Sequence, residues 1–209
     1  MQAVVKKLMR EAGHTFAEEA GIPLKDQPAA LFKLLVLANL MSTRITAGIA
    51  LAAARELFKA GGGTPRGMSR LTWQERVNAL GRGHYVRYDE STATRLGEMA
   101  ELVQDKYDGD LRRLPIEAER DRDRAADLLK EFKGIGPTGV DIFCREAQTV
   151  WPWLRPYFDP QAQKGADRLG LPTAPEKLAD QVPDKDLGRF AAALVRAARD
   201  KRLAEAVTS

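Results

Sequence analysis

Residues 128–170 decide how this chain folds, and they read LLKEFKGIGPTGVDIFCREAQTVWPWLRPYFDPQAQKGADRLG. An apolar helix end leads into the four-residue connection Lys133–Gly136, which Pro137 follows. Proline suits the first position of a new helix, where its missing N–H costs nothing. The two glycines around Ile135 allow a tight turn between helices, with backbone N–H groups facing outward. With the positive end of the next helix, these donors could bind one phosphate, although a plain turn fits the same residues.

The second half of this stretch places a carboxylate at the start of a helix. Asp159 precedes Pro160, which is typical of an N-cap followed by proline at the first helical position. The helix is short, because Gly170 ends it. An N-capping aspartate is usually structural, so the order of the two features is what matters. Asp159 follows Thr138, at the glycine turn, by 21 residues (159 − 138 = 21).

Together, the two features resemble the helix-hairpin-helix DNA glycosylases of the endonuclease III superfamily. Their pattern is roughly L-x-G-[IV]-G-x-[KSY]-[TG]-A, followed by V-D-T-H-x-x-R-x-x-x-R-L-G-L. The matching residues of this chain are FKGIGPTGV at 132–140 and, later, Phe158, Asp159, Lys164 and Arg168–Leu171. The resemblance covers most of the chain, and its specific motifs lie in 42–46 and 132–171.

The resemblance implies an all-α fold of two helical lobes with the active site in a cleft between them. Residues 27–136 would form a six-helix barrel lobe. Residues 1–26 and 137–209 would form the second lobe, which carries Asp159. The residues favour the same fold class on their own, because no useful length of sequence alternates like a β-strand.

Apolar periodicity and turn residues predict where the main helices lie. The expected ranges are 2–20, 28–41, 46–60, 72–80, 89–107, 160–169 and a final helix from 183. The helix over 28–41 is apolar nearly all round, which favours a buried central position. Capping-box patterns mark two of the helix starts, at Thr72 with Glu75 and at Thr173 with Glu176.

Asp159 is the candidate catalytic residue. Breaking an N-glycosidic bond leaves positive charge on the sugar, as in the oxocarbenium-like states of sugar hydrolases. A carboxylate a few ångströms away stabilises that charge by about 4 kcal/mol at an effective dielectric constant near 20. It can also orient or deprotonate an attacking water molecule. The alternative is that Asp159 only caps its helix.

Thr138 stands where bifunctional relatives place a lysine that attacks the sugar and forms a Schiff base. A threonine cannot perform this reaction. The resemblance therefore implies a monofunctional glycosylase that uses water and has no lyase activity. Gly139 and the residues DIFC at 141–144 are similar to the mismatch-specific thymine and uracil glycosylases.

The resemblance also supplies candidate DNA contacts. Arg44 falls at the position of a wedge residue that fills the gap left by a flipped nucleotide, although a surface arginine at a helix junction is the alternative. The other candidate DNA-binding residues are Lys133, Gly134, Ile135, Gly136, Gly139 and Lys164.

An aromatic residue usually occupies the position of Thr138 in the mismatch-specific relatives, so another residue must stack on the extruded base here. Tyr85 and Tyr88, in a loop that interleaves basic and aromatic residues, are the candidates. His84 in the same loop is a candidate general acid. The alternative for this loop is a set of solvated charges.

Composition limits the other possibilities. A net charge of +4 and a pI near 9.2 are consistent with a polyanionic partner without requiring one. Cys144 is the only cysteine, which excludes an intramolecular disulfide and the four-cysteine iron–sulfur cluster of many endonuclease III relatives. With only two histidines, a zinc site is not expected either. No apolar run is long enough to span a membrane, so we expect a cytoplasmic, nucleoid-associated protein.

The sequence therefore predicts a cluster-free, monofunctional DNA glycosylase of base-excision repair that acts as a monomer on double-stranded DNA. Uracil or thymine opposite guanine is the favoured substrate, and an alkylated or deaminated purine is the second. Two alternatives remain: a catalytically silent lesion-binding protein on the same fold, and a helical protein–protein adaptor without affinity for DNA.

Overall fold

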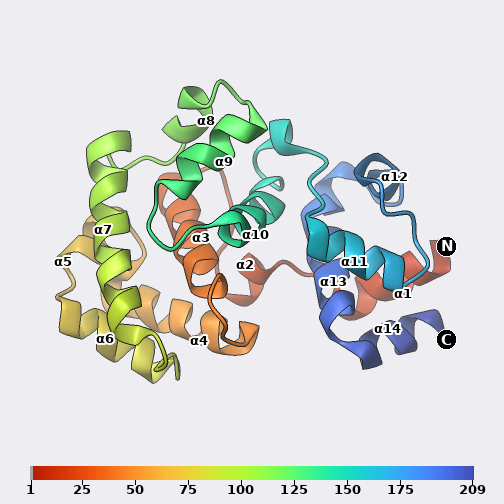
Figure 1. The fold of residues 1–209 in the computed structure, drawn as a ribbon, viewed down its shortest axis with the longest axis horizontal. Helices are drawn as coiled ribbons and strands as arrows, with labels where there is room; N and C mark the ends of the chain where they lie inside the picture. The colour runs from red at the N-terminus through yellow and green to blue at the C-terminus, as the bar shows by residue number, and fades with distance from the viewer. Residues whose placement is uncertain (1) are drawn as a thin grey trace. The chain divides into compact units, whose positions relative to one another are not determined.

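The computed structural model describes residues 2–209, which form helices joined by turns and contain no strand. The all-α prediction is confirmed. These residues form two compact units (Figure 1). We call Ala17–Phe143 the central unit, and the described residues up to Phe16 together with Cys144–Ser209 the terminal unit. The sequence predicts boundaries after residues 26 and 136. In the structure, the division falls after Phe16 and after Phe143, and Phe143 lies inside the uninterrupted helix α10 (Pro137–Ala147).

The central unit is built around α3 (Pro28–Met41), which is buried on all sides, as its apolar sequence predicts. Thr72 and Glu75 form the predicted capping box, with their side chains each accepting from the other's backbone N–H, at 2.7 and 3.2 Å. The other elements of the unit are α4 (Ala47–Leu57), the π-helix η1 (Phe58–Gly62), α5 (Pro65–Arg70), α6 (Trp73–Arg82), α7 (Asp89–Tyr107), α8 (Arg113–Glu117) and α9 (Arg122–Lys130).

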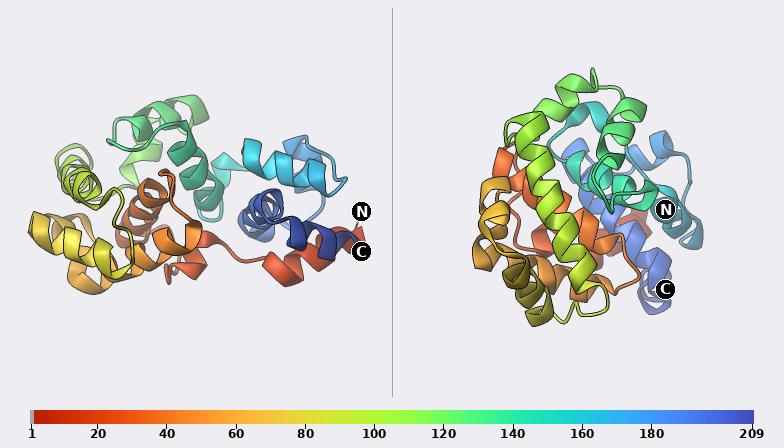
Figure 2. Two further views of the ribbon diagram at one scale, coloured as in Figure 1. Left: turned by 60° about the horizontal axis from the view of Figure 1, so that its bottom comes forward. Right: turned by 60° about the vertical axis from the view of Figure 1, so that its left-hand side comes forward.

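The terminal unit is built around α13 (Leu187–Arg199), which buries most of its surface. It packs against α1 (Gln2–Ala12), α11 (Pro160–Arg168) and α14 (Lys201–Thr208) (Figure 2). A Cβ at Gly165 would overlap the carbonyl group of Leu194, so only glycine lets α11 approach α13 this closely. The remaining elements are η2 (Pro152–Leu154), α12 (Pro175–Ala179) and the 3₁₀ turn η3 (Asp184–Asp186), which takes the place of the first turn of the expected final helix.

The single helix expected over residues 2–20 is wrong, because the chain leaves α1 after Ala12 and starts α2 (Phe16–Glu19) separately. Tertiary partners replace the helical hydrogen bonds at the break. The N–H of Phe16 donates to the buried Glu146 carboxylate at 3.3 Å instead of to a carbonyl of α1. Arg196 Nη1 donates to the carbonyl groups of Ala12 and His14, at 3.3 and 2.6 Å.

The capping box expected at Thr173 and Glu176 is also wrong. The N-cap of α12 is Ala174, and no side chain caps this helix. Pro175 explains the difference, because proline takes the first helical position and the residue before it becomes the cap. Among the described residues, no helix combines the length and the apolar character that crossing a bilayer requires.

Tyr107, the last residue of α7, is a buried phenol whose Oη has no hydrogen-bond partner among the described residues. Burial raises the pKa of Tyr107 to about 12 from its ordinary value of 10.0, while the neighbouring Lys106 acts in the opposite direction. The unfolded chain therefore loses this proton at a lower pH than the folded protein does. As a result, the free energy of unfolding falls as the pH rises from about 10 towards about 12.

We expect Tyr107→Phe to match or exceed the wild type in stability at about pH 8, because the substitution removes a buried hydroxyl that has no partner. Its advantage should grow at about pH 11, because the variant lacks the group that titrates. Urea unfolding followed by circular dichroism measures, at each pH, the difference in the free energy of unfolding between the variant and the wild type. The same difference at both pH values would contradict the role of Tyr107 in alkaline destabilisation.

Candidate functional site

The glycine connection before α10 is a tight turn with one internal backbone hydrogen bond. The N–H of Ile135 donates to the carbonyl of Phe132 at 2.9 Å, and its side chain is buried beneath the turn. The next backbone bond runs from the N–H of Val140 to the carbonyl of Gly136 at 3.0 Å. The N–H groups of the first turn of α10 precede this bond and have no acceptor within the helix. Gly136 and Thr138 are exposed, which places the positive end of α10 at the protein surface.

Asn39 fixes the hairpin to the end of α3. Its side chain is fully buried, and Nδ2 donates to the carbonyl of Lys133 at 3.0 Å. The next residue, Gly134, has a φ of +88°, and a Cβ there would lie 2.7 Å from Asn39 Nδ2. Gly136 is different, because a Cβ on it would meet nothing within 4 Å. Gly134 is thus required by the fold, whereas Gly136 leaves open space on the outer face of the hairpin.

The remaining hairpin candidates lie beside this turn. A Cβ at the buried Gly139 would lie 2.7 Å from Ser42 Oγ, so the first turn of α10 also packs on the end of α3. Thr138 is exposed. Lys133 is exposed and pairs with Glu98 at 2.7 Å, an interaction that solvent screens.

Arg44 is exposed in the loop between α3 and α4 and makes no ion pair or hydrogen bond with the described residues. The residue before it is anchored. The hydroxyl of Thr43 donates to the carbonyl of Leu40 at 3.0 Å, so the hydroxyl of Tyr85, at 2.8 Å, donates to Thr43 Oγ1. Thr92 donates in turn to Tyr85 Oη at 3.5 Å. The loop that carries Arg44 is therefore held from below by the core of the central unit.

Tyr85 corrects a sequence-based expectation. Its ring is fully buried, so it presents no face on which an extruded base could stack. The loop pattern could not reveal this, because tyrosine is common both in cores and on binding surfaces. Tyr88 is half-buried with the guanidinium of Arg87 5.2 Å from its ring centre, and His84 is exposed with a φ of +63°. Of the two tyrosines, Tyr88 alone remains a candidate for stacking.

Asp159 is the N-cap of α11, as predicted, and its carboxylate is engaged on both oxygens. Oδ1 accepts from the backbone N–H groups of Gln161 and Ala162, at 2.9 and 3.3 Å. Oδ2 accepts from Arg145 Nη1 at 2.6 Å. The Arg145 and Asp159 side chains are only 3% and 1% exposed. No sequence pattern indicated this ion pair, because Arg145 belongs to another helix and resembles an ordinary surface charge.

Lys164 lies on the exposed face of α11 and has no ion-pair partner among the described residues. Arg168, one turn further along, donates to the carbonyl of Ala197 at 3.2 Å and so has a structural role. The two basic residues of the motif thus differ in their contacts: Arg168 bonds to the backbone, and Lys164 makes no ion pair with the described residues.

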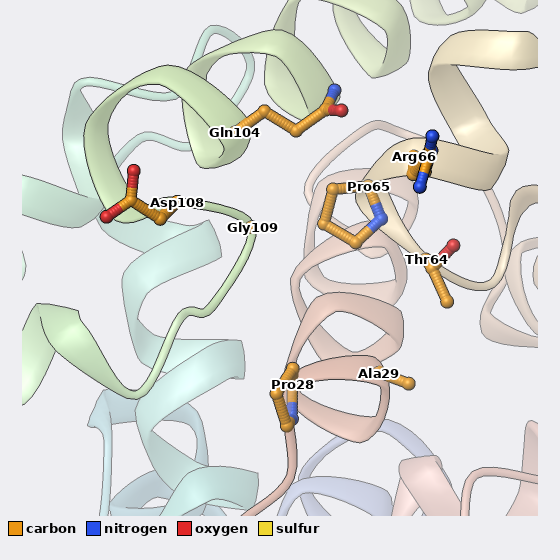
Figure 3. Close-up of a pocket in the computed structure, with 8 residues that line it drawn as sticks. All are labelled: Pro28, Ala29, Thr64, Pro65, Arg66, Gln104, Asp108 and Gly109. Carbon is orange, nitrogen blue, oxygen red and sulfur yellow. The ribbon is translucent and has the colours of Figure 1, made fainter.

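A cavity of about 690 Å³ lies elsewhere in the central unit (Figure 3). It is bounded by the N-terminal ends of α3 and α5 and by the C-terminal end of α7. Its lining residues are Pro28, Ala29, Thr64, Pro65, Arg66, Gln104, Asp108 and Gly109. None of the candidate catalytic, DNA-binding or base-stacking residues named from the sequence lines this cavity.

Two solved structures share the architecture of this chain. A non-covalent endonuclease III–DNA complex matches it with a TM-score of 0.55 and 16% sequence identity, over 92% of this chain and 81% of that one. The chain has the endonuclease III fold. A trapped endonuclease III–DNA covalent intermediate, described as an estranged-adenine complex, gives a TM-score of 0.50 and 16% identity over 91% and 84% of the two chains. No protein-family model matches the sequence, and no curated protein does.

An iron–sulfur cluster of the kind found in many proteins with the endonuclease III fold does not suit the residues of this chain. Such a cluster requires four thiolates, and Cys144 is the only cysteine. Its thiol is buried within α10. Within residues 2–209, no three His, Cys, Asp or Glu side chains are grouped so that they could hold a metal ion.

Proposed function

We propose that the protein is a monofunctional DNA glycosylase of base-excision repair. It hydrolyses the N-glycosidic bond of a flipped base, with uracil or thymine opposite guanine favoured and an alkylated or deaminated purine second. One observation supports this function above the others. A chain with the endonuclease III fold has a glycine hairpin before α10 and a carboxylate at the N-cap of α11, in the same order as in the helix-hairpin-helix glycosylase motif that the sequence resembles.

Asp159 supplies the chemistry in this proposal. The amides of α11 hold Oδ1, so the carboxylate has a fixed orientation before substrate arrives. Its negative charge stabilises the positive charge that develops on the sugar as the base departs, and it orients the attacking water. Thr138 has no amine, so no covalent enzyme–sugar intermediate forms there and the product is an intact abasic strand.

DNA binding rests on the hairpin, Arg44 and Lys164. The hairpin N–H groups bind one backbone phosphate, which positions the duplex without reading its sequence. Arg44 fills the gap that the flipped nucleotide leaves, and its anchored loop supports that role. Tyr88 and His84 are the remaining candidates for contact with the base. We also propose that the protein is a cytoplasmic, nucleoid-associated monomer that works without an iron–sulfur cluster.

A panel of duplexes, each with one lesion or mismatch, tests the proposal. Incubation with the protein and then with alkali should cleave the strand of at least one duplex at the lesion, and the G·U and G·T pairs should rank first. Lesion binding without cleavage on any duplex would leave a catalytically silent binder. Absence of salt-dependent DNA affinity would instead favour a protein–protein adaptor.

The two hairpin glycines form a matched pair of variants. We expect Gly136→Val to retain the fold, because a Cβ at this position meets nothing within 4 Å, yet to weaken binding to all duplexes by about tenfold or more. The added side chain would keep a phosphate from approaching the N–H donors. Gly134→Val should instead destabilise the fold itself. Residue 134 has a left-handed backbone conformation that valine disfavours, and the added side chain would clash with Asn39.

Fluorescence anisotropy against salt concentration, together with thermal unfolding, separates these outcomes. Affinity should fall at every salt concentration in Gly136→Val, with little change in the slope of log affinity against log salt, because neutral N–H groups hold this phosphate. A folded Gly136→Val that binds as tightly as the wild type would mean that the hairpin is only a turn.

A further inference from the structure

Asp159 makes one contact beyond those that cap α11, its ion pair with Arg145. Capping α11 needs a single acceptor, and Oδ1 alone provides it for two N–H groups. Oδ2 is then free to face a ligand, but Arg145 Nη1 lies 2.6 Å from it. The guanidinium is therefore not required by the local helix structure around Asp159.

Stability does not explain the pair either. Removing two opposite charges from water costs free energy that their attraction often fails to recover, and a packed apolar pair is frequently as stable. Arg145 is also incompletely satisfied, because its Nε is buried without a hydrogen-bond partner among the described residues. The ring of Phe16 covers the guanidinium, with its centre 5.6 Å from the Arg145 Cζ. The arrangement holds one carboxylate oxygen in place and leaves the buried Nε of Arg145 without a partner among the described residues.

A carboxylate has about four lone-pair directions. The N–H groups of Gln161 and Ala162 occupy both directions on Oδ1, and Arg145 occupies one on Oδ2. One direction on Oδ2 remains, on a side chain that is 1% exposed. In the proposed reaction, water or a sugar atom would have to use this direction, because the other three are occupied.

We infer that Arg145 is a positioning residue for base excision: it holds Asp159 so that a single lone pair of Oδ2 faces the reacting atoms. The inference rests on the proposed function, since it assigns Asp159 its catalytic role. Arg145 itself need not contact DNA. Its removal should therefore slow the chemical step and leave DNA affinity nearly unchanged.

Arg196 provides a matched control. Its guanidinium lies over the same Phe16 ring, 4.1 Å from the ring centre, but donates to the backbone carbonyls of Ala12 and His14. Arg145→Met and Arg196→Met both remove an arginine from this ring, but only the first releases the Asp159 carboxylate. Arg145→Met also leaves the buried Asp159 carboxylate without its ion-pair partner, so the stability of each variant is measured together with its excision rate.

The experiment measures single-turnover excision, DNA affinity and thermal unfolding on the best duplex from the lesion panel. We expect Arg145→Met to reduce the excision rate by about tenfold to a hundredfold, as expected for a misplaced catalytic group, with nearly unchanged affinity. Arg196→Met should change the rate far less, with both rates measured at a temperature where each variant remains folded. In an Asp159→Asn background, Arg145→Met should cause no further loss of rate.

An excision rate in Arg145→Met no lower than in Arg196→Met would overturn the inference. If Arg145→Met fails to fold, Arg145→Lys keeps a charge without the planar guanidinium. The lysine variant should then be slower than the wild type, and a wild-type rate would also overturn the inference. If Asp159→Asn excises normally, the catalytic assignment fails instead, so the two failures are distinguishable.

Discussion

Asp159→Asn is expected to reduce base excision by about a hundredfold to ten-thousandfold while DNA affinity changes little. An amide is nearly isosteric with the carboxylate but carries no negative charge to stabilise the sugar as the base leaves. The loss therefore belongs to the transition state and should appear in the single-turnover rate. Near-wild-type excision would show that Asp159 is only a helix cap.

The ion pair complicates this variant. An asparagine has one oxygen, which can either cap α11 or accept from Arg145, so one of the two contacts on the carboxylate is lost. Arg145 would then remain as a buried, uncompensated charge, and breaking such a pair costs about 3–5 kcal/mol. That is a large part of the roughly 5–15 kcal/mol that stabilises a typical domain.

A second variant separates lost catalysis from lost folding. Arg145→Met combined with Asp159→Asn removes both charges, so no unpaired ion remains in the core. This double variant should unfold at a higher temperature than Asp159→Asn alone and should still fail to excise the base. Recovery of excision along with stability would show that the single variant had failed through its fold.

The sequence predicted the features that local chemistry determines. Proline at a first helical position marked the starts of α10 and α11, and the side chains of Thr72 and Glu75 marked the start of α6. These signals work because each partner lies within four residues of the other. The same rule explains the error at Thr173, where the proline at position 175 moved the cap to Ala174.

The chemistry around the candidate site was less predictable, because it depends on residues far apart in sequence. Arg145 meets Asp159 from a different helix, and Asn39 reaches the carbonyl of Lys133 across 94 residues. The interleaved basic and aromatic residues of its loop make Tyr85 a stacking candidate, whereas its ring fills the core and its hydroxyl anchors Thr43. Sequence patterns identify which groups are present, but only tertiary packing determines which of them remain available to a ligand.

Thr138→Lys should give the protein an activity that the wild type lacks. The wild type should leave an intact abasic strand, and borohydride should trap little covalent protein–DNA complex, because Thr138 cannot act as an amine nucleophile. In the variant, the amine nitrogen would bond to sugar C1′ as the glycosidic bond breaks. The C1′–O4′ bond would then break, with a proton passing from the amine to O4′, to give an iminium. Borohydride would reduce this iminium to a stable cross-link, or it would lead to strand cleavage without alkali.

The position of Thr138 favours this outcome. It is exposed on the first turn of α10, so a longer side chain would extend into solvent and not into the core. The positive end of the helix lowers the pKa of a nearby amine and raises the fraction that is neutral and nucleophilic. Lys133 adds little to this effect, because Glu98 already pairs with it.

Thr138→Arg is the matched control for the lysine variant. It adds a cation of similar length at the same place, but a guanidinium does not lose its proton and cannot form a Schiff base. Only Thr138→Lys should therefore give trapped complex on gel electrophoresis, while both variants should bind DNA at least as tightly as the wild type. Efficient trapping by the wild type would mean that another amine attacks the sugar and that the monofunctional assignment is wrong. A lysine variant that folds, binds and excises the base but never traps would mean that residue 138 does not face the sugar.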